Sequence, residues 1–171
     1  MTGVFEGRAI LRMPVVRATL VLAFVVAGDQ LAKHAVEHSI VPGEEQKVLP
    51  GISLVYSRNR GVAFGLRPGS NVGVTVVIAV ALLALLVYFL RHRSERLMWL
   101  PTGMLFGGAV ANLVDRIRVG SVVDFIKLPL GWPPFNIADA SITLGVVILF
   151  LLIDHHHHHR SEIGQQIGQR E

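Results

Sequence analysis

The sequence predicts an all-α membrane protein with four transmembrane helices and a small extracytoplasmic β-rich loop region between the first two helices. Of its 171 residues, 51% are hydrophobic and 16% are charged, and the mean hydropathy is +0.53, which is too apolar for an ordinary soluble domain. The apolar residues gather in four long segments separated by short polar ones. We therefore expect one membrane domain over residues 15–153, with a cytoplasmic extension at 1–14 and a polar, His-rich cytoplasmic tail at 154–171.

The clearest predicted span is the second, at residues 72–90, which holds 19 residues without a charge. At 1.5 Å per helical residue, this length matches a hydrocarbon core of about 30 Å. The first span covers residues 15–38, the third 97–117 and the fourth 135–153. Each of these three has its ionisable residues clustered near one end and apolar sequence at the other.

Arginine placement predicts the orientation of the chain. Arginines precede the first span, fill the sequence RHRSER between the second and third spans, and follow the fourth. Because positive residues favour the cytoplasmic side, we expect both termini in the cytoplasm and the segments 40–71 and 118–134 outside. The first outer segment contains KVLPGISLVYS, whose alternating apolar residues and Pro-Gly turn predict a short sheet.

Polar side chains converge on the outer ends of the spans, because the first and third spans run outward and the fourth runs inward. They are Asp29, Lys33, Asn112, Asp115, Arg116, Asn136 and Asp139. The two outer segments bring NRGVAFG (59–65) and VVDF (122–125) to the same layer. Within the third span, Gly103, Gly107 and Ala111 recur every four residues, a spacing that allows helix backbones to approach closely.

Several of these residues also fit a purely structural role. Asp29 and Lys33, four residues apart, match an intrahelical ion pair. Asn136 is a suitable N-cap, with Asp139 in the first turn favoured by the helix dipole. Asp139 and Asp124 are harder to explain structurally, because ionisable groups near membrane depth cost free energy and by default mark function.

Two carboxylates close together in a poorly hydrated site share one proton, so that one acts as a base toward water and the other as an acid. This is aspartic-protease chemistry, which requires no metal or organic cofactor. The chain has no cysteine, no HExxH motif, and no basic patch interleaved with aromatics for nucleic acid. The run at residues 155–159 is interpreted as a solvated tail rather than a metal site.

Three alternatives to an aspartic protease remain open on the residues alone. One is a serine-lysine protease that uses Ser57 or Ser121 with Lys33 or Lys127. Another is a transporter or proton-relay protein with a polar path, although the second span holds no ionisable residue. The last is a structural membrane adaptor, which leaves the carboxylates without a purpose.

The ordered motifs DQLAK, NRGVAFG, GGAVANLVDR, VVDF and FNIADAS closely resemble those of the bacterial lipoprotein signal peptidase (signal peptidase II) family. The resemblance covers residues 15–153. It implies an aspartic endopeptidase of the bacterial inner membrane that cuts prolipoproteins N-terminal to a diacylglyceryl-modified cysteine and is inhibited by globomycin. The expected partners are this substrate and membrane lipids, and the expected state is a monomer.

The resemblance places the catalytic dyad on Asp124, expected in a loop, and Asp139. Asp115 is a rival for the first position, but neighbouring Arg116 offers it a salt bridge. The resemblance also implies supporting or substrate-binding residues, which are Asp29, Lys33, Asn59, Arg60, Asn112, Asp115, Arg116 and Asn136.

Overall fold

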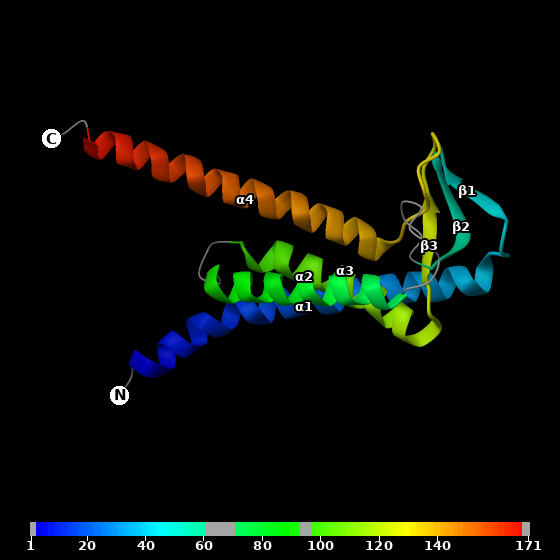
Figure 1. The fold of residues 1–171 in the computed structure, drawn as a ribbon, viewed down its shortest axis with the longest axis horizontal. Helices are drawn as coiled ribbons and strands as arrows, with labels where there is room; N and C mark the ends of the chain where they lie inside the picture. Colours follow the sequence, from blue (N-terminus) through cyan, green and yellow to red (C-terminus); the bar gives the residue numbers. More distant parts are fainter. Residues whose placement is uncertain (1–2, 61–70, 93–96, 169–171) are drawn as a thin grey trace.

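The computed structural model describes residues 3–60, 71–92 and 97–168. In this part of the chain, helices α1 (Gly3–Ser39), α2 (Asn71–His92), α3 (Trp99–Val119) and α4 (Ile137–Gly168) extend in one general direction from a small sheet (Figure 1). The sheet contains β1 (Glu45–Leu49), β2 (Ile52–Asn59) and β3 (Val122–Lys127). Helix α3 packs against both α1 and α4, and α2 packs on α3.

All four predicted apolar segments are helical, and two of the helices are longer than expected. Helix α1 begins at Gly3 and α4 ends at Gly168. The described parts of the expected N-terminal extension and C-terminal tail are therefore helical and continuous with α1 and α4. By length and composition, two stretches of the described residues can cross a membrane, Met13–Ser39 and Ile137–Asp154, and Val80–Arg91 is a shorter apolar helix. Large apolar side chains such as Phe24 and Phe150 are exposed on these helices, as expected for surfaces that face lipid.

Glycines allow the close contacts of α3 with its neighbours. A Cβ atom at Gly103 would lie 2.6 Å from the carbonyl oxygen of Ala18 in α1, and one at Gly108 would lie 2.4 Å from the carbonyl oxygen of Ala138 in α4. Gly107 likewise faces α1. The prediction that this four-residue spacing allows helix backbones to approach closely is confirmed for α1 and α3. Gly108 allows a similar close approach between α3 and α4.

The sheet lies at one end of the helices, where α1 ends and α4 begins (Figure 1). Strands β1 and β2 form the antiparallel pair expected in the first outer segment. Strand β3 pairs antiparallel with β2, and Ser57 lies opposite Asp124. The expectation that Asp124 lies in a loop is therefore wrong. Its strand pairs with a partner more than sixty positions away in the sequence, which the local pattern does not reveal.

A buried apolar cluster fixes the sheet to the end of α1. Val36 of α1 and Ile40, the residue that directly follows α1, contact Phe125 of β3. On the other edge of β3, Ile126 pairs with Phe135, the second residue before α4. Asp124 therefore lies on a strand that is attached both to α1 and to the start of α4.

Candidate active site

The start of α4 is closed by a reciprocal pair of hydrogen bonds. The backbone N–H of Asp139 donates to Oδ1 of Asn136 at 2.8 Å, and the backbone N–H of Asn136 donates to Oδ2 of Asp139 at 3.3 Å. This arrangement is a capping box with shorter side chains than the usual Ser/Thr and Glu/Gln pair. The predicted N-cap is confirmed, and it holds the Asp139 carboxylate in the first turn.

Asn136 also contacts the second carboxylate of the predicted dyad. Its fully buried side chain donates from Nδ2 to Oδ1 of Asp124 at 2.7 Å. The other oxygen of Asp124 accepts from Nδ2 of Asn59 at 3.0 Å. One amide thus binds Asp124 with its nitrogen and caps the helix that carries Asp139 with its oxygen.

Asn112 of α3 holds the other side of Asp139. Its Nδ2 donates to Oδ1 of Asp139 at 2.8 Å. Its Oδ1 accepts from Nζ of Lys33 at 3.0 Å and from Nδ2 of Asn136 at 3.3 Å. Because two donors face the amide oxygen, the amide nitrogen is directed at Asp139.

A buried charge cluster lies behind Asn112. Lys33 Nζ lies 2.6 Å from Oδ2 of Asp29 and 2.6 Å from Oδ2 of Asp115. Oδ1 of Asp29 accepts from the backbone N–H of Ala138 at 2.9 Å. The predicted Asp29–Lys33 pair is confirmed; it is buried, and its contacts link α1, α3 and α4.

The predicted salt bridge between Asp115 and Arg116 is wrong. Adjacent helical residues point about 100° apart, and Asp115 instead pairs with Lys33. Arg116 donates from Nη1 to the carbonyl oxygen of Asn112 at 3.3 Å. Its Nε is buried without a hydrogen-bond partner among the described residues.

Sequence reasoning missed Gln30. Its Nε2 donates to Oδ1 of Asp115 at 2.7 Å and to the carbonyl oxygen of Ala111 at 3.4 Å, so it holds the carboxylate that pairs with Lys33. Gln30 is uncharged, so the pattern of ionisable residues around it does not mark it. The available signal was its place inside DQLAK, three positions before Lys33 and therefore on the same helix face.

The remaining predicted site residue is Arg60, which is exposed and directly follows β2. Residues 61–65 of the NRGVAFG motif lie outside the described part of the chain. The structure therefore places Asn59 at the dyad and leaves the rest of this motif as a sequence-based expectation.

The environment of Asp124 shifts its carboxyl toward the neutral form, relative to an ordinary aspartate. Burial raises the pKa of this carboxyl to about 6, hydrogen bonds from Asn59 and Asn136 oppose the rise, and the charge of Asp139 adds to it. A carboxyl with such a pKa retains its proton more readily than an ordinary aspartic acid and is suited to general acid catalysis.

The alternative serine-lysine protease lacks the required contacts. Lys33 is bound by the charge cluster described above, and Lys127 pairs with Glu45 at 2.5 Å. In the described residues neither lysine hydrogen-bonds to Ser57 or Ser121. The same part of the chain holds no group of three or more histidine, cysteine or acidic side chains placed to bind a metal.

The fold is a bundle of apolar helices with a small sheet at one end. At that end, asparagine side chains donate hydrogen bonds to two aspartates. These features define a membrane protein with a carboxylate site. The family model described as Signal peptidase (SPase) II matches residues 21–154. The chain belongs to the signal peptidase II family.

Several relatives carry the name lipoprotein signal peptidase. That of Moorella thermoacetica is 41% identical over 134 residues, which cover 76% of this chain and 87% of the relative. That of Halothermothrix orenii is 37% identical over 131 residues, which cover 76% and 90%. The protein from Staphylococcus aureus strain JH9 is 34% identical over 135 residues, which cover 76% and 83%.

Solved structures share the fold. A bacterial membrane enzyme determined by the in meso method at 2.3 Å resolution is 32% identical and superposes with a TM-score of 0.74. The match covers 80% of this chain and 86% of that one. A second such structure, at 1.9 Å resolution, has the same TM-score and identity and is covered over 91% of its length.

Proposed function

We propose that this protein removes the signal peptide from diacylglyceryl-modified prolipoproteins by cleaving N-terminal to the lipidated cysteine. The named relatives support the substrate class. The observation that carries the chemistry is that Asn136 hydrogen-bonds Asp124 while capping the helix turn that holds Asp139. This arrangement brings the buried carboxyl group of Asp124 and the half-buried carboxyl group of Asp139 to one site.

In the proposed setting, α1 to α4 each cross the bacterial inner membrane and both termini are cytoplasmic. The sheet and the dyad then face the outer leaflet. Support comes from the asymmetry of the helices, since their buried charged and amide side chains gather at the sheet end and large apolar side chains such as Leu20 and Leu151 are exposed along their length. The protein acts as a monomer in this proposal.

The two aspartates have different roles in the proposed reaction. Asp139 is the base, because the N-terminal end of α4 favours a negative charge in the first turn and Asn112 donates to its carboxylate. Asp124 is the acid, because burial favours its protonated form. This difference in environment is what separates the roles of two chemically identical groups.

The proposed steps conserve protons. Asp139 takes a proton from water as the water oxygen attacks the scissile carbonyl, and Asp124 gives its proton to the carbonyl oxygen. In the resulting tetrahedral intermediate, Asp139 returns its proton to the leaving nitrogen. Asp124 recovers a proton from one hydroxyl as the carbonyl re-forms and the C–N bond breaks.

A cleavage assay tests this function. The full chain in detergent is given a diacylglyceryl prolipoprotein and, in parallel, the same prolipoprotein without the lipid. We expect cleavage of the lipidated substrate alone, a product that begins with the lipidated cysteine, and inhibition by globomycin. A transporter or adaptor would leave both substrates intact, and this outcome would refute the proposal.

A further inference from the structure

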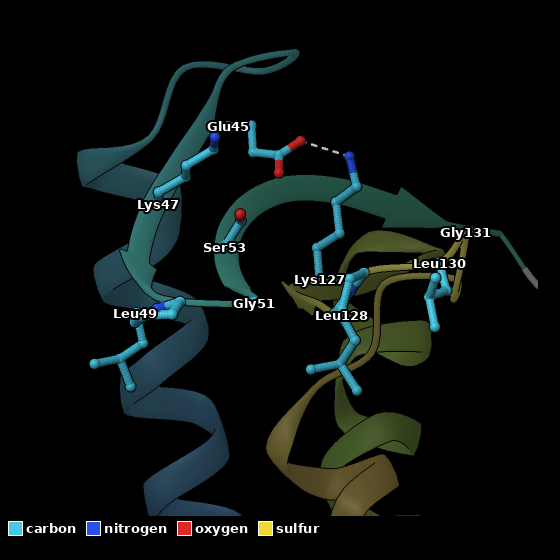
Figure 2. A pocket seen from close by; sticks show the side chains of 11 residues that line it. Glu45, Lys47, Leu49, Gly51, Ser53, Lys127, Leu128, Leu130 and Gly131 are labelled. Atoms are coloured by element: carbon cyan, nitrogen blue, oxygen red, sulfur yellow. Dashed lines mark hydrogen bonds and ion pairs between the residues drawn. The ribbon is translucent and has the colours of Figure 1, made fainter.

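A cavity of about 440 Å³ lies in the sheet, away from the dyad. It is bounded by the β1–β2 turn and by the segment that follows β3 (Figure 2). It shares no residue with the aspartate site. The proposed peptidase activity therefore gives this cavity no role.

One part of the cavity lining is charged. Nζ of Lys127 lies 2.5 Å from Oε2 of Glu45, and this hydrogen bond holds the pKa of the Glu45 carboxyl below its ordinary value. Lys47 also lines the cavity and makes no hydrogen bond or ion pair among the described side chains. With both lysines and the glutamate ionised, this part of the lining carries one excess positive charge.

The other part of the lining is apolar. Leu49 and Leu128 point away from the Glu45–Lys127 pair (Figure 2), and Leu130 is fully exposed at the rim. Trp132, one residue beyond the lining, is 62% exposed. Exposed leucine and tryptophan beside lysine are typical of a surface that lies at a membrane interface.

The chain connections keep this cavity close to the membrane surface. Glu45 follows the end of α1 by six residues, and Gly131 precedes the start of α4 by six. Six extended residues reach at most about 20 Å. Because Met13–Ser39 and Ile137–Asp154 are, within the described residues, the stretches long and apolar enough to span, both sides of the cavity lie within reach of the lipid headgroups.

We propose that this cavity binds one glycerophospholipid of the adjacent leaflet. Lys47 and Lys127 contact the phosphate, and Leu49, Leu128 and Leu130 contact the first part of an acyl chain. A phosphate compensates the excess positive charge, and the chain removes the exposed leucines from water. The bound lipid secures the sheet, and with it Asp124 on β3, at the membrane surface.

The full chain in detergent is incubated with palmitoyl-oleoyl-phosphatidylglycerol, and bound lipid is counted by native mass spectrometry. We expect one retained lipid, at least fivefold less retention in Lys47→Gln, and recovery in Lys47→Arg. Lys47 is the residue of choice because its replacement breaks no ion pair. Arg118→Gln is the matched control, since Arg118 is an exposed cation at the sheet end of α3, and it should bind like wild type.

Three results would overturn the lipid site, and the first two concern retention. One is equal retention by wild type and Lys47→Gln, and the other is equal retention of dioleoylglycerol, which lacks the phosphate. Displacement of the phospholipid by millimolar inorganic phosphate alone would also contradict it, because the acyl contacts would then contribute nothing. Cleavage of prolipoprotein in detergent should be unchanged in Lys47→Gln, so that failure here and failure of the peptidase proposal are distinguishable.

Discussion

Asn136 donates a 2.7 Å hydrogen bond from its side-chain amide to the carboxylate of Asp124. The same amide caps α4 through the backbone N–H of Asp139. One residue therefore sets both the position of the strand carboxylate and the turn that carries the helix carboxylate. Substitutions at position 136 can separate these two contributions.

Asn136→Ala should lose both contributions. Loss of the cap should lower the free energy of unfolding by about 1 kcal/mol, and loss of the contact with Asp124 should lower kcat about 100-fold. Asn136→Ser is the matched control, because serine retains the cap but is too short to replace the amide bond. If Asn136→Ser were as active as wild type, the contact with Asp124 would be unimportant for catalysis.

Helix positions were more predictable from the sequence than the contacts of the site. Long apolar runs indicate helices directly, and the i, i+4 spacing of Asp29 and Lys33 sufficed for their ion pair. Strand β3 and the partner of Asp115 depend on residues distant in the sequence. Local spacing could not reveal that Lys33 of α1 would compete with Arg116 for Asp115.

The pH dependence of stability should report the buried Asp124. Its folded pKa of about 6 lies above the ordinary aspartate value of 3.8, so its contribution is fully present below that value and is lost as pH rises through about 6. Asn is neutral throughout this range. The melting temperature of Asp124→Asn relative to wild type should therefore rise between pH 4 and pH 7, and a constant difference would contradict the raised pKa.

Gln30→Ala should reveal the support given to Asp115. Removal of the 2.7 Å hydrogen bond frees one carboxylate oxygen in the cluster that orients Asn112. We expect kcat to fall roughly tenfold with KM unchanged, because only the alignment of Asp139 is affected. Leu31→Ala, at a neighbouring residue that is 70% exposed, is the control and should leave both constants unchanged. A change confined to KM would assign Gln30 to substrate binding instead.

Gly108→Ala should separate α3 from α4. The added Cβ would lie 2.4 Å from the carbonyl oxygen of Ala138, so the helices must move apart next to Asp139. The free energy of unfolding should fall by about 1–3 kcal/mol, with loss of activity. Gly28→Ala is the matched control, because nothing lies within 4 Å of its Cβ and alanine favours the helix. Equal thermal stability of the two variants would exclude close packing at Gly108.

The most direct test of the aspartic mechanism is prolipoprotein cleavage by Asp124→Asn and Asp139→Asn. Each replacement preserves shape but removes an acid-base group, so each should abolish detectable cleavage while the protein remains folded in detergent. Glu37→Gln, an exposed carboxylate at the same end of α1, should cleave like wild type. If either aspartate variant cleaved the lipidated substrate at a near wild-type rate, Asp124 and Asp139 would not form the catalytic dyad.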